Sequence, residues 1–257
     1  FARVLQLCDH AGFTQRQAQA RARGKLRGIG FANAIERAAS PSQPEYAEIR
    51  FNPSGTAMVL VGTKAQGQGH ETLYKQILNE RLGLDPKDVK FIDGDTDRVA
   101  FGMGTNGSRS TVIGGGAAWT AADRIIEKGR KIAAHVLEAS VEDVEFKAGQ
   151  FSVRGTDKTI GIKEVAKSSF VLTKLPPGLE GGLFETATYA PKSETWPNGS
   201  HACEVEIDPG TGEVQVVGYW VVDDVGTMIN PVGVKGQIHG GVAQGLGQAL
   251  MERVVYD

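Results

Sequence analysis

Alternating apolar and polar positions predict two β-hairpins in this chain. Residues 45–51 and 56–61 alternate on either side of Asn-Pro-Ser-Gly, which is a favourable turn sequence. Residues 201–207 and 214–222 alternate in the same way around Pro-Gly-Thr-Gly. Shorter strands are expected at 26–34, 89–92, 144–146, 151–153 and 186–189.

Other segments carry apolar residues at the spacing of a helix. One helix is expected just after residue 70, with Gly83 where a C-terminal cap belongs and apolar positions at Leu73, Tyr74, Ile77, Leu78 and Leu82. A longer helix follows residues 102–116 and is expected to bury Trp119, Ala122, Ile126, Ala133 and Val136. Residues 1–23 and about 232–253 also have helical patterns. Helices mixed with hairpins predict an α+β fold.

The predicted elements group into consecutive stretches along the chain. They are 1–44 with a helix, a strand and a linker, 45–175 as a first lobe, and 183–257 as a second lobe that is incomplete at its C-terminal end. A loop with two prolines separates the lobes. Hairpin, Gly-Gln-x-His and helix occur in this order at 53–82 and again at 209–253. This faint repeat predicts two similar lobes, each offering a Gln-bearing helix start to a shared cleft.

The segment between the first hairpin and its helix contains the most informative motif, Gln66, Gly67, Gln68, Gly69 and His70. A strand that turns into a helix presents free backbone N–H groups and a positive dipole end to an anion. The glycines let a ligand approach the backbone, and Gln68 and His70 add side-chain donors. A tight turn without a ligand is the alternative. No Lys-Ser/Thr follows the glycines and the motif lacks a third Gly, so a Walker loop and a Rossmann site are disfavoured.

A second small-residue motif precedes the long helix and consists of Gly107, Ser108, Arg109, Ser110 and Thr111. One hydroxyl is expected to cap the helix, with Arg109 solvated as the alternative to a ligand contact. Three hydroxyls are more than a cap uses. The glycines at 114–116 cost the helix roughly 1 kcal/mol each, which indicates that something approaches the backbone closely there.

The last predicted helix is rich in glycine and glutamine. Packing against another helix explains the glycines as well as a ligand does, whereas the amides of Gln237 and Gln244 favour a ligand. Glycine is abundant overall, at 34 of 257 residues. Because it clusters at these few places between strongly apolar segments, backbone contact with a ligand is favoured over disorder.

Composition and charge exclude several classes of protein. The net charge of -2 gives no electrostatic basis for binding nucleic acid or an anionic membrane, and no run reaches the roughly 20 apolar residues of a membrane span. Cys8 and Cys203 show no paired spacing, which favours a reducing compartment, and no metal-ligand spacing is present. The acidic residues at 93–97 do not form a calcium loop, because Gly104 stands where its glutamate would be.

The sequence resembles the molybdenum-cofactor subunit of the xanthine dehydrogenase, aldehyde oxidase and aerobic carbon monoxide dehydrogenase family. The resemblance covers nearly the whole chain in the family's order. It rests on Gly-Gln-Gly-His-Glu-Thr at 67–72, Gly-Ser-Arg-Ser-Thr at 107–111, Asn230-Pro231, Gly236-Gln237 and Gln244-Gly245, with further similarity at 24–30 and 93–96.

The resemblance implies that a molybdopterin dinucleotide lies in a cleft between the lobes and that its dithiolene, not a protein side chain, holds molybdenum. Residues 66–70 are then expected to bind the phosphates or the pterin, and 107–111, Gln237 and Gln244 the remaining edges. The family hydroxylates aldehydes and N-heterocycles with oxygen from water, and a copper-containing branch oxidises carbon monoxide. Iron–sulfur and FAD partner subunits or domains, a cytoplasmic oligomer of heterotrimers and, for a bacterial protein, the cytosine form of the cofactor are also implied.

The sequence departs from the family's pattern at the catalytic base. The family's Glu in a Val-Gly-Glu-like motif is expected downstream of the last helix, and Glu213 is a hairpin-turn residue that does not replace it. The upstream Gly-Gly-Phe-Gly loop is absent too. The chain is therefore expected to be part of a longer protein, inactive alone and with weak or no hold on the cofactor. A non-catalytic nucleotide- or anion-binding domain is the alternative function.

Overall fold

The computed structural model describes residues 1–257, which contacts between Cα atoms group into two compact units. The first unit comprises 1–37, 195–228 and 234–257, and the second comprises 38–194 and 229–233. This grouping differs from the three consecutive stretches expected from the sequence. The N-terminal segment joins the C-terminal part of the chain because strands near the two ends pair with each other.

The second unit is built on a four-stranded mixed sheet with the order β4-β3-β2-β8. Its strands are β2 (Glu45–Phe51), β3 (Ala57–Val61), β4 (Val89–Ile92) and β8 (Phe184–Tyr189). The predicted β2–β3 hairpin is confirmed, and β2 is also antiparallel to β8. β3 and β4 are parallel, so a crossover must connect them.

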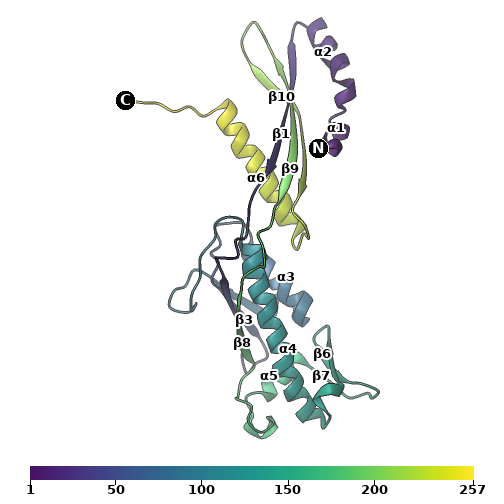
Figure 1. The fold of residues 1–257 in the computed structure, drawn as a ribbon, viewed down its shortest axis with the longest axis vertical. Helices are drawn as coiled ribbons and strands as arrows, with labels where there is room; N and C mark the ends of the chain where they lie inside the picture. The colour runs from purple at the N-terminus through teal and green to yellow at the C-terminus, as the bar shows by residue number, and fades with distance from the viewer. The chain divides into compact units, whose positions relative to one another are not determined.

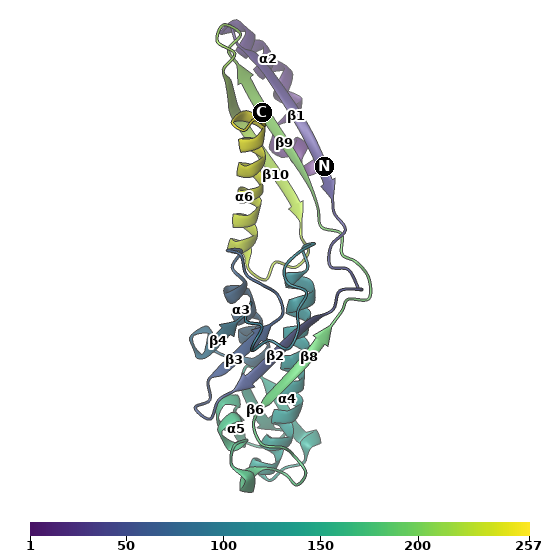
Figure 2. The same cartoon turned by 90° about the vertical axis from the view of Figure 1, so that its left-hand side faces the viewer.

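Two helices cover one face of this sheet, as Figures 1 and 2 show. α3 (His70–Leu82) is the crossover between β3 and β4, and α4 (Gly115–Leu137) packs against α3, β2 and β8. The core between helices and sheet is continuous and includes Ala47, Ile49, Val59, Val61, Tyr74, Ile77, Ala118, Ala122 and Ile125. Gly83 ends α3 in the left-handed conformation, with a φ of 66°, as predicted from its position.

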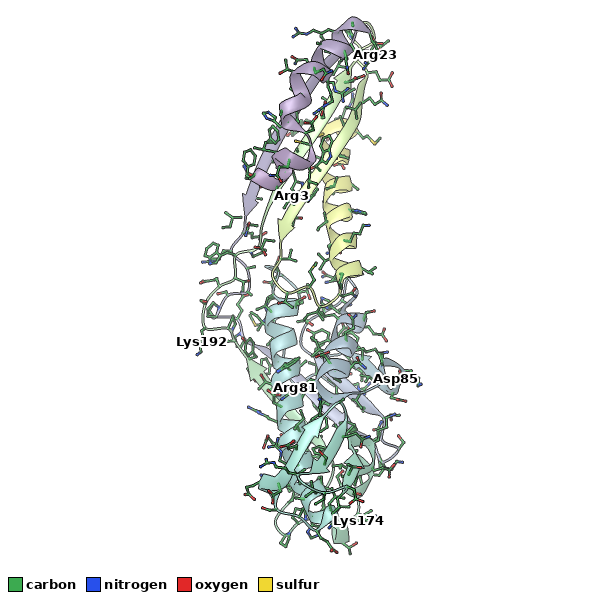
Figure 3. The ribbon with its side chains drawn as sticks, turned by 90° about the vertical axis from the view of Figure 1, so that its right-hand side faces the viewer. Arg3, Arg23, Arg81, Asp85, Lys174 and Lys192 are labelled. Carbon is green, nitrogen blue, oxygen red and sulfur yellow. The ribbon has the colours of Figure 1, made fainter.

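One residue of the predicted buried face of α4 is exposed. Trp119 is 41% exposed, and the guanidinium of Arg81 from α3 lies 5.3 Å from the centre of its ring. Arg81, which is labelled in Figure 3, also pairs with Asp123. The indole is therefore covered by a cation from the neighbouring helix and not by the core.

A small second sheet completes this unit. β5 (Val144–Lys147) and β6 (Gln150–Val153) form the predicted short hairpin, and β7 (Thr159–Gly161) adds a third strand that leads into α5 (Ile162–Ser168). The sequence did not predict β7 or α5, which are too short for a clear periodicity. Short helical turns occupy Pro86–Asp88, Ser110–Gly114, Val141–Asp143 and Leu172–Lys174.

The first unit contains a three-stranded antiparallel sheet in the order β1-β9-β10. The strands are β1 (Leu26–Ile35), β9 (Asn198–Ile207) and β10 (Val214–Asp224). Helix α1 (Ala2–Leu7) packs on it with Val4, which clusters with Cys8 and with Ala202 of β9. Helix α2 (Phe13–Ala22) follows after a short turn at His10–Gly12 and contacts β1. The single helix predicted over 1–23 is interrupted because Asp9 has a φ of 46° and caps the next turn.

Charged side chains also fasten α2 to the sheet of the first unit. The carboxylate of Glu204 is fully buried and accepts hydrogen bonds from Arg16 on α2 and from Arg27 on β1. Arg27 also pairs with Glu206. Burial opposes ionisation of Glu204, but the bonds from the two guanidinium groups outweigh it and lower the pKa of Glu204. Glu204 is thus ionised and paired at neutral pH.

The last helix, α6 (Pro231–Leu250), begins at a proline, and the side chain of Asn230 caps it by accepting a hydrogen bond from Gly233 N at 3.0 Å. None of its residues is buried. The Gly-Gln-x-His of 236–239 lies inside this helix, whereas Gln66–His70 precedes α3. The predicted repeat therefore does not place the two motifs in equivalent positions, and Gln237 is not at a helix start.

Both units combine helices with separate antiparallel or mixed sheets, which confirms the predicted α+β class. Their topologies differ, because only the second unit contains a parallel β3–α3–β4 crossover. Among the helices, none has the length and apolar character required to cross a membrane.

The close packing of α4 on the small sheet makes a testable prediction. A Cβ at Gly129 would lie 2.6 Å from a ring carbon of the fully buried Phe151. We expect Gly129→Ala to lower the free energy of unfolding by about 1–2 kcal/mol. The cost of overpacking the core is larger than the about 1 kcal/mol that alanine gains over glycine in helix propensity. Urea titration measures the effect. Gly240→Ala, which meets no atom within 4 Å, is the control and should cause no loss.

Candidate functional site

The glycine-rich turn between β3 and α3 faces open space. Gly67 has a φ of 104° and Gly69 a φ of 83°, so both positions require the left-handed backbone that glycine adopts readily. A Cβ built on either residue would meet no atom within 4 Å. Glycine is needed here for the backbone conformation, and the surface that the turn presents is free of protein atoms.

The first turn of α3 offers unpaired backbone donors next to this surface. Gly69 is the N-cap residue and provides no side-chain cap, and its carbonyl accepts from Leu73 N at 3.1 Å. The N–H groups of His70, Glu71 and Thr72 make no hydrogen bond to a protein acceptor. Three such donors at the positive end of a thirteen-residue helix are an arrangement that favours an anion.

His70 adds a side-chain group to this helix start. Its ring is 4% exposed, packs edge-on against Tyr74 with centroids 6.0 Å apart, and has no hydrogen-bond partner at Nδ1. Burial lowers the pKa of His70, although the charge of Asp93 acts in the opposite direction. The imidazole is therefore neutral at pH 7 and has one buried nitrogen that no protein group satisfies.

The second predicted motif lies beside the first, because a threonine between the two loops connects them. The Thr105 hydroxyl donates to Lys64 O at 2.7 Å and accepts from Lys64 N at 3.1 Å. It also lies 3.0 Å from Ser110 Oγ. In addition, Ala65 N donates to the carboxylate of Asp93. The structure thus brings the segments 66–70 and 107–111 to one place in the second unit.

Tyr74 of α3 adds hydrogen bonds at this junction. Its hydroxyl lies 2.8 Å from Thr63 Oγ1 and donates to Ser110 O at 3.2 Å. Burial raises the pKa of Tyr74, so the phenol remains a neutral donor. One hydroxyl therefore connects the strand before the glycine turn to the start of α4.

The three glycines at the start of α4, Gly114 to Gly116, have a different role from the one expected from the sequence. A Cβ at Gly114 would lie 2.1 Å from the Tyr74 hydroxyl, and one at Gly116 would lie 2.5 Å from the ring of Tyr189. Gly115 faces Ile77 at 3.2 Å. Protein side chains, not a ligand, thus approach the backbone at these positions, and small residues permit the packing of α4.

The five residues of the second motif divide into two groups. Gly107, Ser108 and Thr111 are exposed, and the first two have φ values of 51° and 50°. Ser110 is buried at the Thr105 junction, and Arg109 is 1% exposed with its guanidinium bound to Glu45 and to backbone carbonyls. Only the exposed three offer atoms to a ligand, and the alternative in which Arg109 is solvated does not hold.

The remaining predicted residues lie in other positions. Gln66 is exposed, and its N–H donates to the Gln68 side-chain oxygen at 2.5 Å, which leaves the Gln68 amide nitrogen free to donate. Gln237 and Gln244 belong to the first unit and are exposed on α6, seven residues apart and so on one side of the helix.

Comparison with known proteins identifies the family. The sequence profile of the molybdopterin cofactor-binding domain matches residues 3–257. The chain is 38% identical over 269 residues to the carbon monoxide dehydrogenase large chain of Hydrogenophaga pseudoflava. The aligned region covers 99% of this chain and 33% of that protein. The chain belongs to the molybdopterin cofactor-binding family.

Other members extend the comparison. The nicotine 6-hydroxylase large subunit of Paenarthrobacter nicotinovorans is 35% identical over 265 residues, covering 98% of this chain and 32% of that protein. The crystal structure of quinoline 2-oxidoreductase from Pseudomonas putida 86 matches with a TM-score of 0.90 at 37% identity, covering all of this chain and 34% of that one. The chain thus spans about one third of the length of these relatives.

Sequence reasoning missed the residues that hold the family's glycine turn in place. Thr63, Tyr74, Thr105 and Glu45 act through hydrogen bonds between segments that are distant in sequence, so no local pattern marks them. Asp93 was considered as part of an acidic segment that does not form a calcium loop, whereas its carboxylate accepts from Ala65 N. Its position after β4, at the carboxyl end of a parallel strand, was the signal that could have identified it.

The lowered pKa of His70 predicts a pH dependence of stability. Below the ordinary pKa of 6.5, His70 binds a proton in the unfolded chain but stays neutral in the folded chain, where its pKa is lower. The free energy of unfolding therefore falls as the pH drops from 7 through 6.5. His70→Gln should remove this contribution, which is at most about 1.4 kcal/mol per pH unit. Urea unfolding at pH 7.0 and 5.5 measures it. The exposed His239→Gln is the control, and an equal slope in wild type and His70→Gln would contradict the prediction.

Proposed function

We propose that this chain binds a molybdopterin dinucleotide through residues 66–70 and the exposed residues Gly107, Ser108 and Thr111. The observation that carries the proposal is the open glycine turn at the start of α3, where three N–H groups and His70 Nδ1 have no protein partner. The match of the chain to the molybdopterin cofactor-binding domain over 3–257 supports this assignment over that of an unrelated anion.

The residues present fit the chemistry of this cofactor. Phosphate oxygens are acceptors and would satisfy the free N–H groups of α3, which also lie at the positive end of the helix dipole. The pterin carries both donors and acceptors, which suits a neutral imidazole and the Gln68 amide nitrogen. No cluster of His, Cys, Asp or Glu could hold a metal ion in this structure, and the proposal requires none, because the dithiolene of the cofactor binds molybdenum.

Gln237 and Gln244 are proposed to bind the same cofactor from α6. Both side chains are exposed on one side of the helix, so their amides are free to pair with a ligand. Their role differs from that of the α3 turn, because they lie inside the helix, where backbone N–H groups are used by the helix itself. Only their side chains can contribute.

The intact protein is proposed to hydroxylate an N-heterocycle or an aldehyde, or to oxidise carbon monoxide. When bound, the molybdenum centre supplies the redox chemistry, with oxygen derived from water. The chain's own contribution is to bind and orient the cofactor, and the catalytic base is proposed to be a Glu outside this sequence. Relatives named for carbon monoxide and for nicotine are 38% and 35% identical, so overall similarity does not select one substrate.

Iron–sulfur and FAD subunits or domains are proposed to carry the electrons away, within an oligomer of heterotrimers. The designations large chain and large subunit of the relatives support a complex of several chains. The bacterial sources of these relatives support the cytosine form of the cofactor. Two cysteines without a disulfide, Cys8 and Cys203, support a reducing, cytoplasmic location.

A pair of matched glycine variants tests the cofactor site. Gly69 and Gly178 have φ values of 83° and 81°, and neither has an atom within 4 Å of a built Cβ, so alanine strains the backbone equally at both. We expect Gly69→Ala to lower the molybdenum and pterin content of the full-length protein at least fivefold. Alanine raises the free energy of the binding turn in its required conformation by about 1 kcal/mol, which weakens cofactor binding by that factor. Gly178→Ala should retain both. Metal analysis and pterin fluorescence provide the measurement.

Two outcomes would contradict the proposal. The first is a wild-type protein, made in a host that synthesises the cofactor, that contains neither molybdenum nor pterin. The second is an equal loss of cofactor in Gly69→Ala and Gly178→Ala. A bound nucleotide without pterin would instead support a non-catalytic nucleotide-binding domain.

A further inference from the structure

We propose that the buried ion pair between Arg109 and Glu45 is a positioning device, and that neither side chain contacts the ligand. The inference rests on the proposed function, since it explains how the chain holds the two loops that would receive the cofactor. The side chain of Arg109 is 1% exposed and that of Glu45 is fully buried. Both belong to the second unit, as do the loops they connect.

The guanidinium of Arg109 has no exposed donor for a ligand, because both terminal nitrogens bind protein acceptors and the side chain is buried. Nη1 donates to Glu45 Oε2 and to Gly104 O at 2.8 Å. Nη2 donates to Gln43 O at 2.8 Å and to Pro44 O at 3.0 Å. Each of these nitrogens carries two hydrogens, so all four are used. The remaining donor, Nε, is buried without a partner.

The carboxylate of Glu45 lies where the two loop-bearing segments touch. Its Oε2 accepts from Met103 N at 3.3 Å. A Cβ at Gly62 would lie 1.9 Å from Glu45 Oε1, and a Cβ at Gly102 would lie 2.2 Å from Gly62 O. Gly62 leads into the glycine turn and Gly102 into the loop before α4. The carboxylate therefore contacts both segments at the point where each loop begins.

The loops are held together at a second point by Thr105 and Lys64. Arg109 spans the loop that follows, because its side chain binds Gly104 O while its own backbone carbonyl accepts from Ile113 N in the helical turn before α4. Gly107 and Ser108 lie between these fixed points and are exposed. Arg109 and Glu45 thus set the position at which the exposed residues are presented beside the α3 turn.

Arginine suits this task in a way that lysine does not. The planar guanidinium fixes the directions of its donors and so determines where the carboxylate and three carbonyls lie, whereas an ammonium is a compact charge with freely rotating donors. Arg109→Lys therefore keeps the charge beside Glu45 and removes the fixed geometry. The substitution separates positioning from neutralisation of the buried carboxylate.

The test is hydrogen exchange of the full-length protein made in a host that cannot synthesise the cofactor. We expect Arg109→Lys to accelerate amide exchange at least tenfold in peptides covering 62–69 and 101–110, with peptides from β5 to β7 unchanged. In a cofactor-producing host the same variant should contain at least fivefold less molybdenum and pterin. Arg154→Lys, whose ion pair with Glu145 is exposed, is the matched control and should change neither.

Other results would overturn the inference. If Arg109 contacted the ligand directly, its variant would lose cofactor with normal exchange at 62–69. Faster exchange throughout the second unit would indicate a general stabilising role. If Arg109→Lys does not fold, Glu45→Gln, which preserves shape and one acceptor, is judged by the same criteria. A wild-type protein without molybdenum and pterin refutes the proposed function, while exchange in the cofactor-free protein still decides whether Arg109 positions the loops.

Discussion

A single hydroxyl joins the two loops on which the candidate site depends. Thr105 bonds both the N–H and the carbonyl of Lys64, which is 41 residues earlier in the chain, and also approaches Ser110. The Tyr74 hydroxyl and the Glu45 carboxylate join the same two segments. Together these contacts give the unpaired N–H groups of α3 and the exposed residues of the second loop one support.

The residues that hold the two loops together are largely buried and polar. Burying a polar group costs free energy unless that group has a hydrogen-bond partner. Glu45, Tyr74 and Ser110 meet that condition through the bonds described above. His70 Nδ1 and the first N–H groups of α3 do not meet it within the protein. The N–H groups of α3 lie at the exposed glycine turn, where a ligand can reach them, whereas His70 Nδ1 and Arg109 Nε are buried without a partner. Free donors at an exposed helix start distinguish this turn from one whose donors are capped by the protein.

Local sequence patterns predicted the hairpins and the limits of α3, because turns, caps and amphipathic spacing are short-range features. They did not predict the interruption at Asp9, the pairing of β1 with β9, or the exposure of Trp119, since each depends on tertiary contacts. The same reason applies within the site. A buried Arg109 and a packed Gly114 have the same sequence signature as ligand-binding residues, and only distances to Glu45 and Tyr74 reveal their roles.

The most direct measurement is a crystal structure of the full-length protein with its cofactor bound. The account predicts cofactor oxygens within hydrogen-bond distance of the N–H groups of His70, Glu71 and Thr72, next to Gly67 and Gly69, with the Arg109 guanidinium still turned toward Glu45. A cofactor bound elsewhere, with the α3 turn filled by protein side chains or by water alone, would contradict it.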